Sequence, residues 1–311
     1  FRFLLWLLST MVRNTTGQIK DKIKRREAYM KLKQQRKQEK YENRMRKKKE
    51  REELGDAAPP KQMPKTLDSM RTPDETMVDE QDEEIQKDED EDEWASYFKD
   101  ETPPKLLITT QQAPSLRTKQ FIEELQGLFP HGKYVKRKDF ELKLITKFAI
   151  NRGYTDLLVV TEQHKKPYIM IVSHLPKGPT ATFRISSLML HNELTNPAER
   201  SKHFPELNMK GFGTRLGRRM GRLLQALFPP KADLSGRSIA TFHNQRDFIF
   251  FRYHRYIFDS MAKVRIQELG PRFTLRLKSL QNGLFDPQHG EYEWAYHKKE
   301  MGGKDRKMFN L

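Results

Sequence analysis

The chain has 311 residues, no cysteine, 32% charged residues and a net charge of +17. The lack of cysteine excludes disulfides and cysteine-ligated zinc, and no apolar run approaches the ~18 residues that a membrane-spanning helix needs. The charge is divided unevenly, because residues 1–101 have 23 Lys+Arg and 24 Asp+Glu, whereas residues 102–311 have 36 and 18. A folded part with twice as many bases as acids indicates a polyanionic or strongly acidic partner, with nucleic acid as the first candidate.

The N-terminal region is predicted to contain one long basic helix. Residues 1–18 are expected to be poorly structured, and residues 1–10 are interpreted as an extension foreign to the native protein, because the first methionine is Met11. Residues 19–54 contain no Gly or Pro and hold 16 bases and 7 acids, which predicts a helix that stops at Gly55. Its apolar residues are too sparse for a coiled coil. The sequence leaves two roles open, a helix that binds RNA or an acidic protein surface, and a solvated arm.

Residues 55–102 are predicted to be a linker, first Pro-containing and then acidic. Asp74–Glu101 contains 15 acids and only two lysines, so self-repulsion is expected to keep it disordered. The favoured interpretation is a solubilising linker. The alternative is that the segment folds back on the basic domain and competes with RNA. Three aromatic residues, Trp94, Tyr97 and Phe98, are candidates to dock its end onto a partner or onto the domain.

A globular domain is predicted over residues 103–296, followed by a basic tail at 297–311. Helices are expected from Ser115, as the N-cap, to about Phe129, and over Phe140–Asn151 with Asp139 as the N-cap. Strands are predicted at Leu106–Thr110, Tyr134–Lys138, Asp156–Glu162, Pro167–Leu175 and Thr180–Ile185. This alternation of strands and helices indicates an α/β layered fold.

A polar connection, Asn192–Glu206, is predicted to lead into a second half. It begins with a helix, Thr214–Phe228, which has a leucine-rich face and an arginine face. Strands follow at Ser238–His243, Phe248–Phe258 and Phe273–Leu280, with a four-residue turn at 244–247. Phe248–Phe258 is predicted to be a central strand covered on both faces, whereas Phe273–Leu280 alternates between apolar and cationic residues.

A short internal repeat supports the division into two halves. The sequence LQGLFP at 125–130 recurs as LQALFP at 224–229. Each copy ends a predicted helix and precedes a predicted strand.

The cationic surface is the main functional signal, and arginine suits bidentate contacts to phosphate. The alternatives are a solvated face or pairing with carboxylates, and few acids are expected nearby, so phosphate contact is favoured. Tyr253, His254 and Tyr256 are candidates to stack on bases, although ordinary core packing is favoured for them. The predicted RNA-binding residues are Arg184, Arg215, Arg218, Arg219, Arg222, Arg246, Arg272, Arg276 and Lys278.

Catalytic signals are weak. Gly211, Gly213, Gly217 and Gly221 do not have the spacing of a nucleotide-binding loop, so turns and close packing explain them better. The sequence predicts no cofactor, no metal site and no enzyme activity. A metal-dependent ribonuclease, using carboxylates such as Asp139, is kept as the less favoured alternative, beside a protein scaffold that binds an acidic partner.

Three long runs carry a family resemblance. They are SHLPKGPTATFRISS at 173–187, ATFHNQRDFIFFRYHRYIF at 240–258 and IQELGPRFTLRLKSLQNGLFD at 266–286. These runs resemble the Brix domain, and the last resembles its sigma-factor-like motif. The resemblance implies an α/β fold of two similar halves, each like an anticodon-binding domain. It also implies a nucleolar assembly factor that binds ribosomal RNA in precursors of the large subunit, takes part in RNA processing and acts with another assembly factor or ribosomal protein.

Overall fold

The structure is a computed structural model that places the chain in two compact units, divided between Lys65 and Thr66. It describes residues 19–55, 63–66, 69–72, 76–78, 82–100, 102–129, 131–199, 203–231, 233–260, 263–286, 290–301 and 308–311. The predictions for residues 1–18 lie outside these ranges.

The first unit contains one long helix, α2 (Lys22–Leu54), as the sequence predicts. It begins at Asp21, whose carboxylate accepts hydrogen bonds from the backbone N–H groups of Ile23 (2.7 Å) and Lys24 (3.2 Å). It ends at Gly55, where a φ of +51° closes the last turn at little steric cost. No residue of α2 is buried. Among the described residues, no helix combines the length and apolar character needed to cross a membrane.

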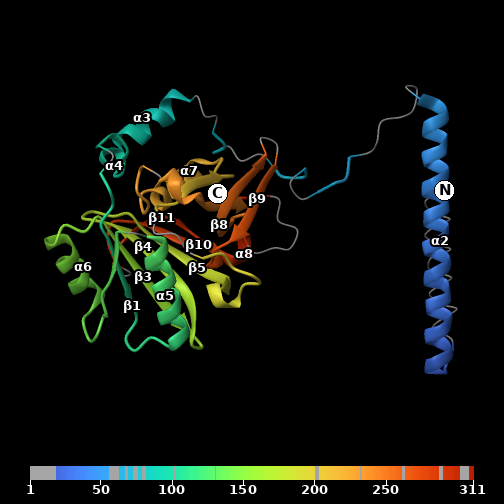
Figure 1. Cartoon of the computed structure of the whole chain (residues 1–311), viewed down its shortest axis with the longest axis horizontal. Coiled ribbons are helices and arrows are strands. Elements are labelled where there is room, and N and C mark those ends of the chain that lie inside the picture. The colour runs from blue at the N-terminus through green and yellow to red at the C-terminus, as the bar shows by residue number, and fades with distance from the viewer. Residues whose placement is uncertain are drawn as a thin grey trace. The chain divides into compact units, whose positions relative to one another are not determined.

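The second unit is built on one mixed sheet that contains eleven strands within the described residues. Their order is β2-β1-β3-β4-β5-β10-β8-β7-β6, with β9 paired to β8 and β11 paired to β10 (Figure 1). The strands are β1 (Leu106–Thr110), β2 (Gly132–Tyr134), β3 (Asp156–Gln163), β4 (Lys166–His174), β5 (Thr180–Met189), β6 (Glu206–Lys210), β7 (Ser238–Gln245), β8 (Phe248–Ser260), β9 (Lys263–Glu268), β10 (Arg272–Asn282) and β11 (Glu291–Ala295). The helices are α3 (Glu83–Glu91), α4 (Ala95–Asp100), α5 (Leu116–Leu128), α6 (Leu142–Asn151), α7 (Arg215–Gln225) and α8 (Lys298–Met301).

The sheet consists of two similar halves, as expected. In the first half β1 is parallel to β3, and β3, β4 and β5 are antiparallel neighbours. The second half repeats this plan, since β6 is parallel to β7 and the order β7, β8, β10 is antiparallel. The halves join where β5 pairs with β10 in antiparallel fashion. Phe129 and Phe228, equivalent residues of the sequence repeat, pack together with ring centroids 5.0 Å apart.

The main core lies between one face of this sheet and helices α5 and α7. Phe121 and Leu125 of α5 and Leu224 of α7 are fully buried against strand residues such as Phe183 and Phe251. A smaller core lies on the opposite face, where α6 covers β1 and β3. On β5, β8 and β10, the side chains that alternate with these core residues, such as Arg184, Phe250 and Arg276, point to that same opposite face, and none of them belongs to the core under α6.

Several local signals differ from their sequence predictions. The Ser115 side chain does not cap α5; its N–H and hydroxyl instead donate to Glu162 Oε2 at 3.0 and 2.6 Å. The N-cap of α6 is Glu141 rather than Asp139. The β7–β8 turn is tighter than four residues, because Arg246 and Asp247 both have positive φ, as in a two-residue hairpin loop. The sequence reasoning also missed β6, β9 and β11 and placed β2 too late.

Strand β8 is central, between β7 and β10, but only the core face of its first half is buried. Ile249 and Phe251 are fully buried, whereas Ile257 and Phe258 are 54% and 64% exposed. The prediction that both faces are covered is therefore wrong. The open face of the first half is only partly covered, with Phe248 37% exposed, and the outer half pairs with β9 as a hairpin.

The acidic segment is not disordered where the structure describes it. Residues 83–91 and 95–100 form α3 and α4, which lie beside α7 in Figure 1. Trp94 is completely buried, and its neighbours join the main core. The physical reason is that arginines of α7 neutralise the acids, so self-repulsion does not decide the conformation. The segment folds back on the domain, as the alternative interpretation stated.

Candidate nucleic-acid interface

Arg184, Arg276 and Lys278, termed here the cationic cluster, come together on the open face of the sheet. Arg184 of β5 lies directly opposite Arg276 of β10 in the strand register. Lys278 is two residues further along β10, where the register to β5 shifts, and it lies over the same Tyr296 ring as Arg276. The intervening residues of β10 point into the core and are at most 2% exposed, namely Phe273, Leu275 and Leu277. The predicted alternation of this strand is confirmed.

Aromatic rings hold these cations in place. The Cζ atom of Arg276 lies 4.3 Å from the ring centroid of Tyr296 and 5.1 Å from that of Phe248. Lys278 Nζ lies 4.3 Å from the same Tyr296 ring. On the neighbouring strands, Arg184 Cζ lies 5.2 Å from the ring centroid of Tyr168. Such cation–π contacts fix the side chains while leaving their hydrogen-bond donors available.

The cationic cluster lacks counter-charges. Among the described side chains, no carboxylate forms an ion pair with Arg184, Arg276 or Lys278. Burial lowers the pKa of Lys278, and the nearby charges of Arg276, Arg184 and Lys298 lower it further. A group of like charges that depresses a lysine pKa is stabilised by any anion that binds among them. Phosphate groups of nucleic acid have the charge and geometry for this role.

The two other predicted residues of this half have different surroundings. Arg272 lies on β10, but its Nη2 pairs with Glu268 Oε2 at 3.0 Å. Arg246 lies in the β7–β8 turn rather than on the strand. The sequence correctly placed Arg272 on the same strand face as Arg276 and Lys278. It did not show that the charge of Arg272 is already neutralised by Glu268.

The four arginines of α7, termed here the α7 arginine face, are paired with carboxylates. Arg215 Nη2 lies 2.5 Å from Asp88 Oδ2, and Arg218 Nε lies 2.7 Å from Glu89 Oε1. Arg219 pairs with Glu93 (3.1 Å) and Glu293 (2.8 Å). Arg222 makes a two-pronged contact to Asp92, at 2.5 and 2.9 Å. The prediction that too few acids lie nearby is wrong. Four of these five acids come from a segment more than 120 residues earlier, and Glu293 comes from β11.

The aromatic candidates of β8 are engaged within the fold. Tyr253 is 2% exposed and belongs to the core, which confirms the favoured interpretation. The Tyr256 hydroxyl donates to Glu206. Burial lowers the pKa of the half-buried His254, against the opposing effect of Glu268. The rings that accompany the cationic cluster are instead Tyr168, Phe248 and Tyr296, none of which the sequence reasoning selected.

The glycine-rich stretch serves backbone packing, as favoured. At Gly211, with φ of +85°, an added Cβ would lie 2.3 Å from the carbonyl oxygen of Asn244. Only glycine allows this approach. Among the described residues, no group of three or more His, Asp and Glu side chains is arranged to hold a metal ion.

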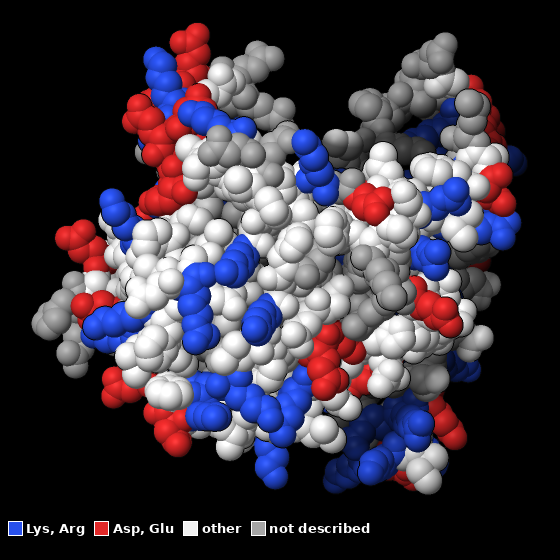
Figure 2. All heavy atoms as spheres, turned by 60° about the vertical axis from the view of Figure 1, so that its left-hand side comes forward, with Lys and Arg blue, Asp and Glu red and all other residues white. Residues whose placement is uncertain are grey.

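Basic side chains are distributed over several regions of the surface. On the face shown in Figure 2, Lys and Arg occur in separate groups, several of them beside acidic side chains. Net charge alone therefore does not locate an interface.

The comparisons with known proteins identify the family. The Brix domain model matches residues 111–279, which is more than half of the chain. The chain belongs to the Brix domain family. This Brix protein is 49% identical over 293 residues to "Ribosome production factor 1" of Pongo abelii, covering 94% of this chain and 84% of that protein. It is 40% identical to a Brix domain-containing protein of Schizosaccharomyces pombe, covering 95% of this chain and all of the relative.

Solved structures include two remote neighbours of this Brix protein. A probable ribosomal biogenesis protein from Aeropyrum pernix K1 is 18% identical, with a TM-score of 0.41, and the match covers 56% of this chain and 96% of that one. Mil, an archaeal Imp4-like protein, is 17% identical, with a TM-score of 0.34, and the match covers 57% of this chain and 99% of that one.

Proposed function

We propose that this Brix protein is a non-catalytic assembly factor of ribosome biogenesis that binds ribosomal RNA in precursors of the large subunit. Support comes from the relatives, which are named ribosome production factor 1 and share about half of their residues with this chain over most of its length. The proposed place of action is the nucleolus within the nucleus, where such precursors are processed. The proposed partners are pre-ribosomal RNA together with other assembly factors or ribosomal proteins.

The observation that carries the RNA proposal is the cationic cluster without counter-charges. Arg184, Arg276 and Lys278 are positioned on a rigid sheet, and their neighbours Tyr168, Phe248 and Tyr296 present ring surfaces beside them. Guanidinium groups contact phosphate oxygens, and rings stack on unpaired bases. This combination favours structured RNA with exposed loops, recognised mainly through its backbone and with low sequence specificity.

The test is RNA binding by a triple variant, Arg184→Gln with Arg276→Gln and Lys278→Gln. The probe is a labelled RNA stem–loop, and affinity is measured over a range of salt concentrations. Each lost phosphate contact reduces the slope of log K against log salt by roughly 0.7–0.9. We expect the slope to fall by about two and the affinity to fall at least tenfold near 0.1 M salt.

The matched control removes three positive charges elsewhere. Lys119, Lys143 and Lys147 are exposed residues of α5 and α6, and their change to Gln gives the same net charge as the triple variant. The control should keep its affinity within about twofold. Equal losses in both variants would show that overall charge, rather than the cationic cluster, determines binding. Thermal unfolding of both variants checks that the domain remains folded.

A second test addresses the ribosomal assignment in cells. The tagged protein is purified at moderate salt, and the bound RNA is sequenced. Enrichment of large-subunit precursor RNA over mature RNA is the expected result, together with a nucleolar signal by microscopy. Enrichment of small-subunit precursor would move the protein to another branch of Brix function, and no ribosomal precursor at all would contradict the proposal.

The non-catalytic character is tested separately. Precursor RNA is incubated with the protein and Mg²⁺, and the products are sized. We expect the RNA to remain intact. Cleavage that needs the metal and disappears on mutation of carboxylates would instead support the ribonuclease alternative.

A protein partner is proposed in addition, because two elements expose apolar side chains. Helix α2 has no buried residue over its 33 residues. The hairpin of β8 and β9 exposes Phe258, Val264 and Ile266, with Phe258 and Val264 opposite each other in the register. Exposed apolar groups of this kind are typical of contacts with another protein. Co-purification that survives ribonuclease but is lost on changing Phe258→Ser and Ile266→Ser would support this partner contact.

A further inference from the structure

The acidic helix α3 matches the α7 arginine face residue by residue. Its acids recur at helical spacing, and each partner arginine lies one turn or less from the next. The pairs run in order along the two elements, from Asp88 with Arg215, through Glu89 with Arg218, to Asp92 with Arg222. A row of carboxylates at this spacing presents negative charge to the arginines much as a row of phosphates does.

Helix α3 depends on these arginines for its conformation. Its nine residues, EEIQKDEDE, include six acids and one lysine, and its last turn contains no base. Like charges in successive turns repel, and acids near a helix C-terminus oppose the helix dipole. A helix this short is also unstable on its own in water. The segment is therefore helical because it is bound, which is the behaviour of an exchangeable ligand.

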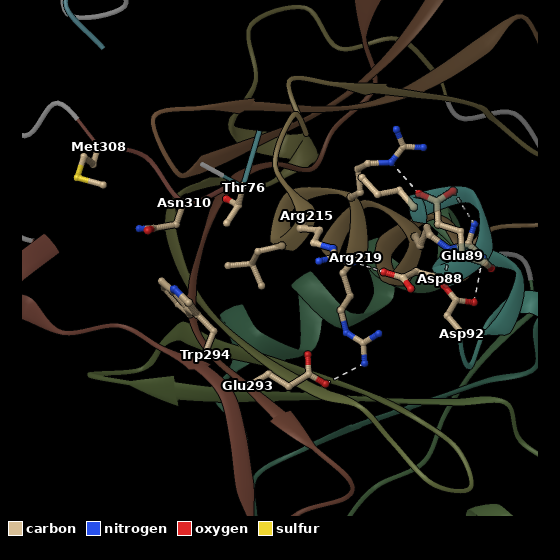
Figure 3. A pocket seen from close by; sticks show the side chains of 14 residues that line it. Thr76, Asp88, Glu89, Asp92, Arg215, Arg219, Glu293, Trp294, Met308 and Asn310 are labelled. Carbon is tan, nitrogen blue, oxygen red and sulfur yellow. Dashed lines mark hydrogen bonds and ion pairs between the residues drawn. The ribbon is translucent and has the colours of Figure 1, made fainter. Parts of the chain in front are cut away.

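The ion pairs between the acidic segment and α7 are exposed to solvent at one end of the contact and buried at the other. The Arg215 and Asp88 side chains are 53% and 58% exposed, whereas Arg222 and Asp92 are 15% and 8% exposed. A cavity of about 550 Å³ runs along the contact and is lined by Arg215 and Asp88 of the exposed end as well as by Asp92 of the buried end (Figure 3). Solvent ions and an incoming polyanion therefore reach the pairs of Arg215 first.

An aromatic anchor follows directly after the acids. Trp94 is completely buried, with Arg219 5.5 Å from its ring centroid. The Tyr97 hydroxyl donates to the Phe228 carbonyl oxygen at 2.5 Å, and Phe98 stacks under Arg222. None of these contacts uses a carboxylate of α3. If α3 leaves, the anchor keeps it tethered beside the arginines at a high effective concentration.

We propose that the α7 arginine face is a second RNA-binding surface, whose place α3 occupies in the free protein. RNA phosphates replace the carboxylates of α3, while the aromatic anchor stays bound. The exchange makes binding at this face conditional, because a ligand must compete with a tethered acidic helix. Weak or isolated anions are excluded, and an extended phosphate backbone with several charges is favoured. This inference rests on the RNA-binding function proposed above.

The test compares two double variants of α3 and its C-terminal flank. Glu89→Gln with Glu93→Gln removes acids that pair with α7. Glu83→Gln with Glu91→Gln removes exposed acids of the same helix that form no ion pair with any described residue. Both change the net charge equally. With the RNA stem–loop as probe, we expect the first variant to bind about fivefold or more tightly, with a salt slope steeper by one to two. The second should stay within about twofold of the parent.

A further variant assigns the gain to the α7 arginine face. Adding Arg218→Gln and Arg219→Gln to the first variant should return the affinity and the salt slope to those of the parent chain. Hydrogen exchange gives an independent readout in the unmodified protein. On addition of RNA, the amides of residues 83–93 should exchange faster, while those of residues 94–98 keep their protection.

Two outcomes would overturn the inference. Either both α3 variants gain the same affinity, or neither gains and residues 83–93 keep their protection in the RNA complex. These outcomes are distinguishable from failure of the proposed function. If the proposed function fails, the parent chain does not bind RNA through Arg184, Arg276 and Lys278, and this result does not depend on the state of α3.

Discussion

The α7 arginine face and the cationic cluster have similar residues and opposite electrostatics. Burial lowers the pKa of Arg219, but Glu293 and Glu93 raise it, so that its pKa lies above the usual value. The pKa of Lys278 is lowered by burial and by the cations Arg276, Arg184 and Lys298. The first region is neutralised by its own chain, whereas the second has no counter-charge among the described residues. Arginine content therefore overstates the surface that is ready to bind RNA.

The largest expected effect comes from removing the anchor of the acidic segment. Trp94→Ala removes a completely buried indole, and a truncation of this kind costs about 3 kcal/mol or more. We expect the amides of residues 83–93 to lose their protection against hydrogen exchange. The α7 arginine face should then become available, so that it binds RNA as the cationic cluster does. Hydrogen exchange and RNA titration measure the two effects.

Tyr97→Phe is the matched control for the anchor. It keeps the buried ring and removes the hydroxyl, which donates to the Phe228 carbonyl oxygen at 2.5 Å and to that of Gln225 at 3.4 Å; this loss costs about 1 kcal/mol. If Trp94→Ala leaves α3 protected, the aromatic residues do not anchor the segment.

A second prediction separates paired from unpaired arginines on one strand. Arg276→Gln should weaken RNA binding about tenfold, since it removes an uncompensated cation. Arg272→Gln should change affinity less than threefold, because Arg272 is paired with Glu268 at 3.0 Å. Equal losses would mean that ion pairing does not decide which arginines contact RNA.

A third prediction concerns a carboxylate outside both arginine regions, whose loss should affect stability and not RNA binding. Glu162 lies outside both regions and accepts hydrogen bonds at the start of α5 from Ser115 and Thr118, at 2.6 and 2.5 Å. Burial opposes ionisation of Glu162, but these hydrogen bonds lower its pKa below the usual value. We expect Glu162→Gln to cost about 1 kcal/mol of unfolding free energy at pH 7 and to leave RNA affinity unchanged.

The pH dependence of this effect has a defined sign. Because the folded-state pKa of Glu162 is depressed, its stabilisation is present above the unfolded-state pKa and is lost as the pH falls through the folded-state value. The difference between parent and variant should therefore disappear in acid. A constant difference at all pH values would contradict the proposed ionised cap.

The smallest expected effect concerns the titration of Lys278. The folded-state pKa of Lys278 lies below its unfolded-state pKa, so between these two pKa values unfolding takes up protons. The contribution of Lys278 to stability therefore rises with pH until the pH reaches the unfolded-state pKa. Arg276→Gln should shift the Lys278 pKa upward, towards the usual lysine value. NMR titration of the labelled lysine measures this shift, and an unchanged pKa would show that the neighbouring cations do not interact.

The periodicity of apolar residues in the sequence was sufficient to predict most of the fold. The apolar residues Phe273, Leu275 and Leu277 are in the core because a strand alternates, and the repeat containing Phe129 and Phe228 marks two halves that pack together. Predictions from neighbouring residues failed where the hydrogen-bond partner comes from a distant part of the chain. The start of α5 is capped by Glu162, which belongs to β3, so Ser115 was the wrong choice for the capping side chain.

The interface was less predictable than the fold. The sequence placed Arg276 and Lys278 on the correct face, but the rings that hold them come from other strands or follow β11, as Tyr296 does. The pairing of α7 joins residues such as Asp92 and Arg222, which are 130 positions apart. One available signal was the spacing of acids in residues 84–93, which matches that of the α7 arginines, directly before the aromatic residues Trp94, Tyr97 and Phe98.

Ultraviolet cross-linking of the parent chain to an RNA stem–loop, with the peptides identified by mass spectrometry, tests the central claim most directly. We expect cross-links at Tyr168, Phe248 and Tyr296 beside the cationic cluster. Cross-links in α7 should remain weak until Glu89→Gln and Glu93→Gln are introduced. Cross-links confined to other surfaces, such as α2 or α6, would contradict the assignment of the β5–β10 face as the RNA-binding surface.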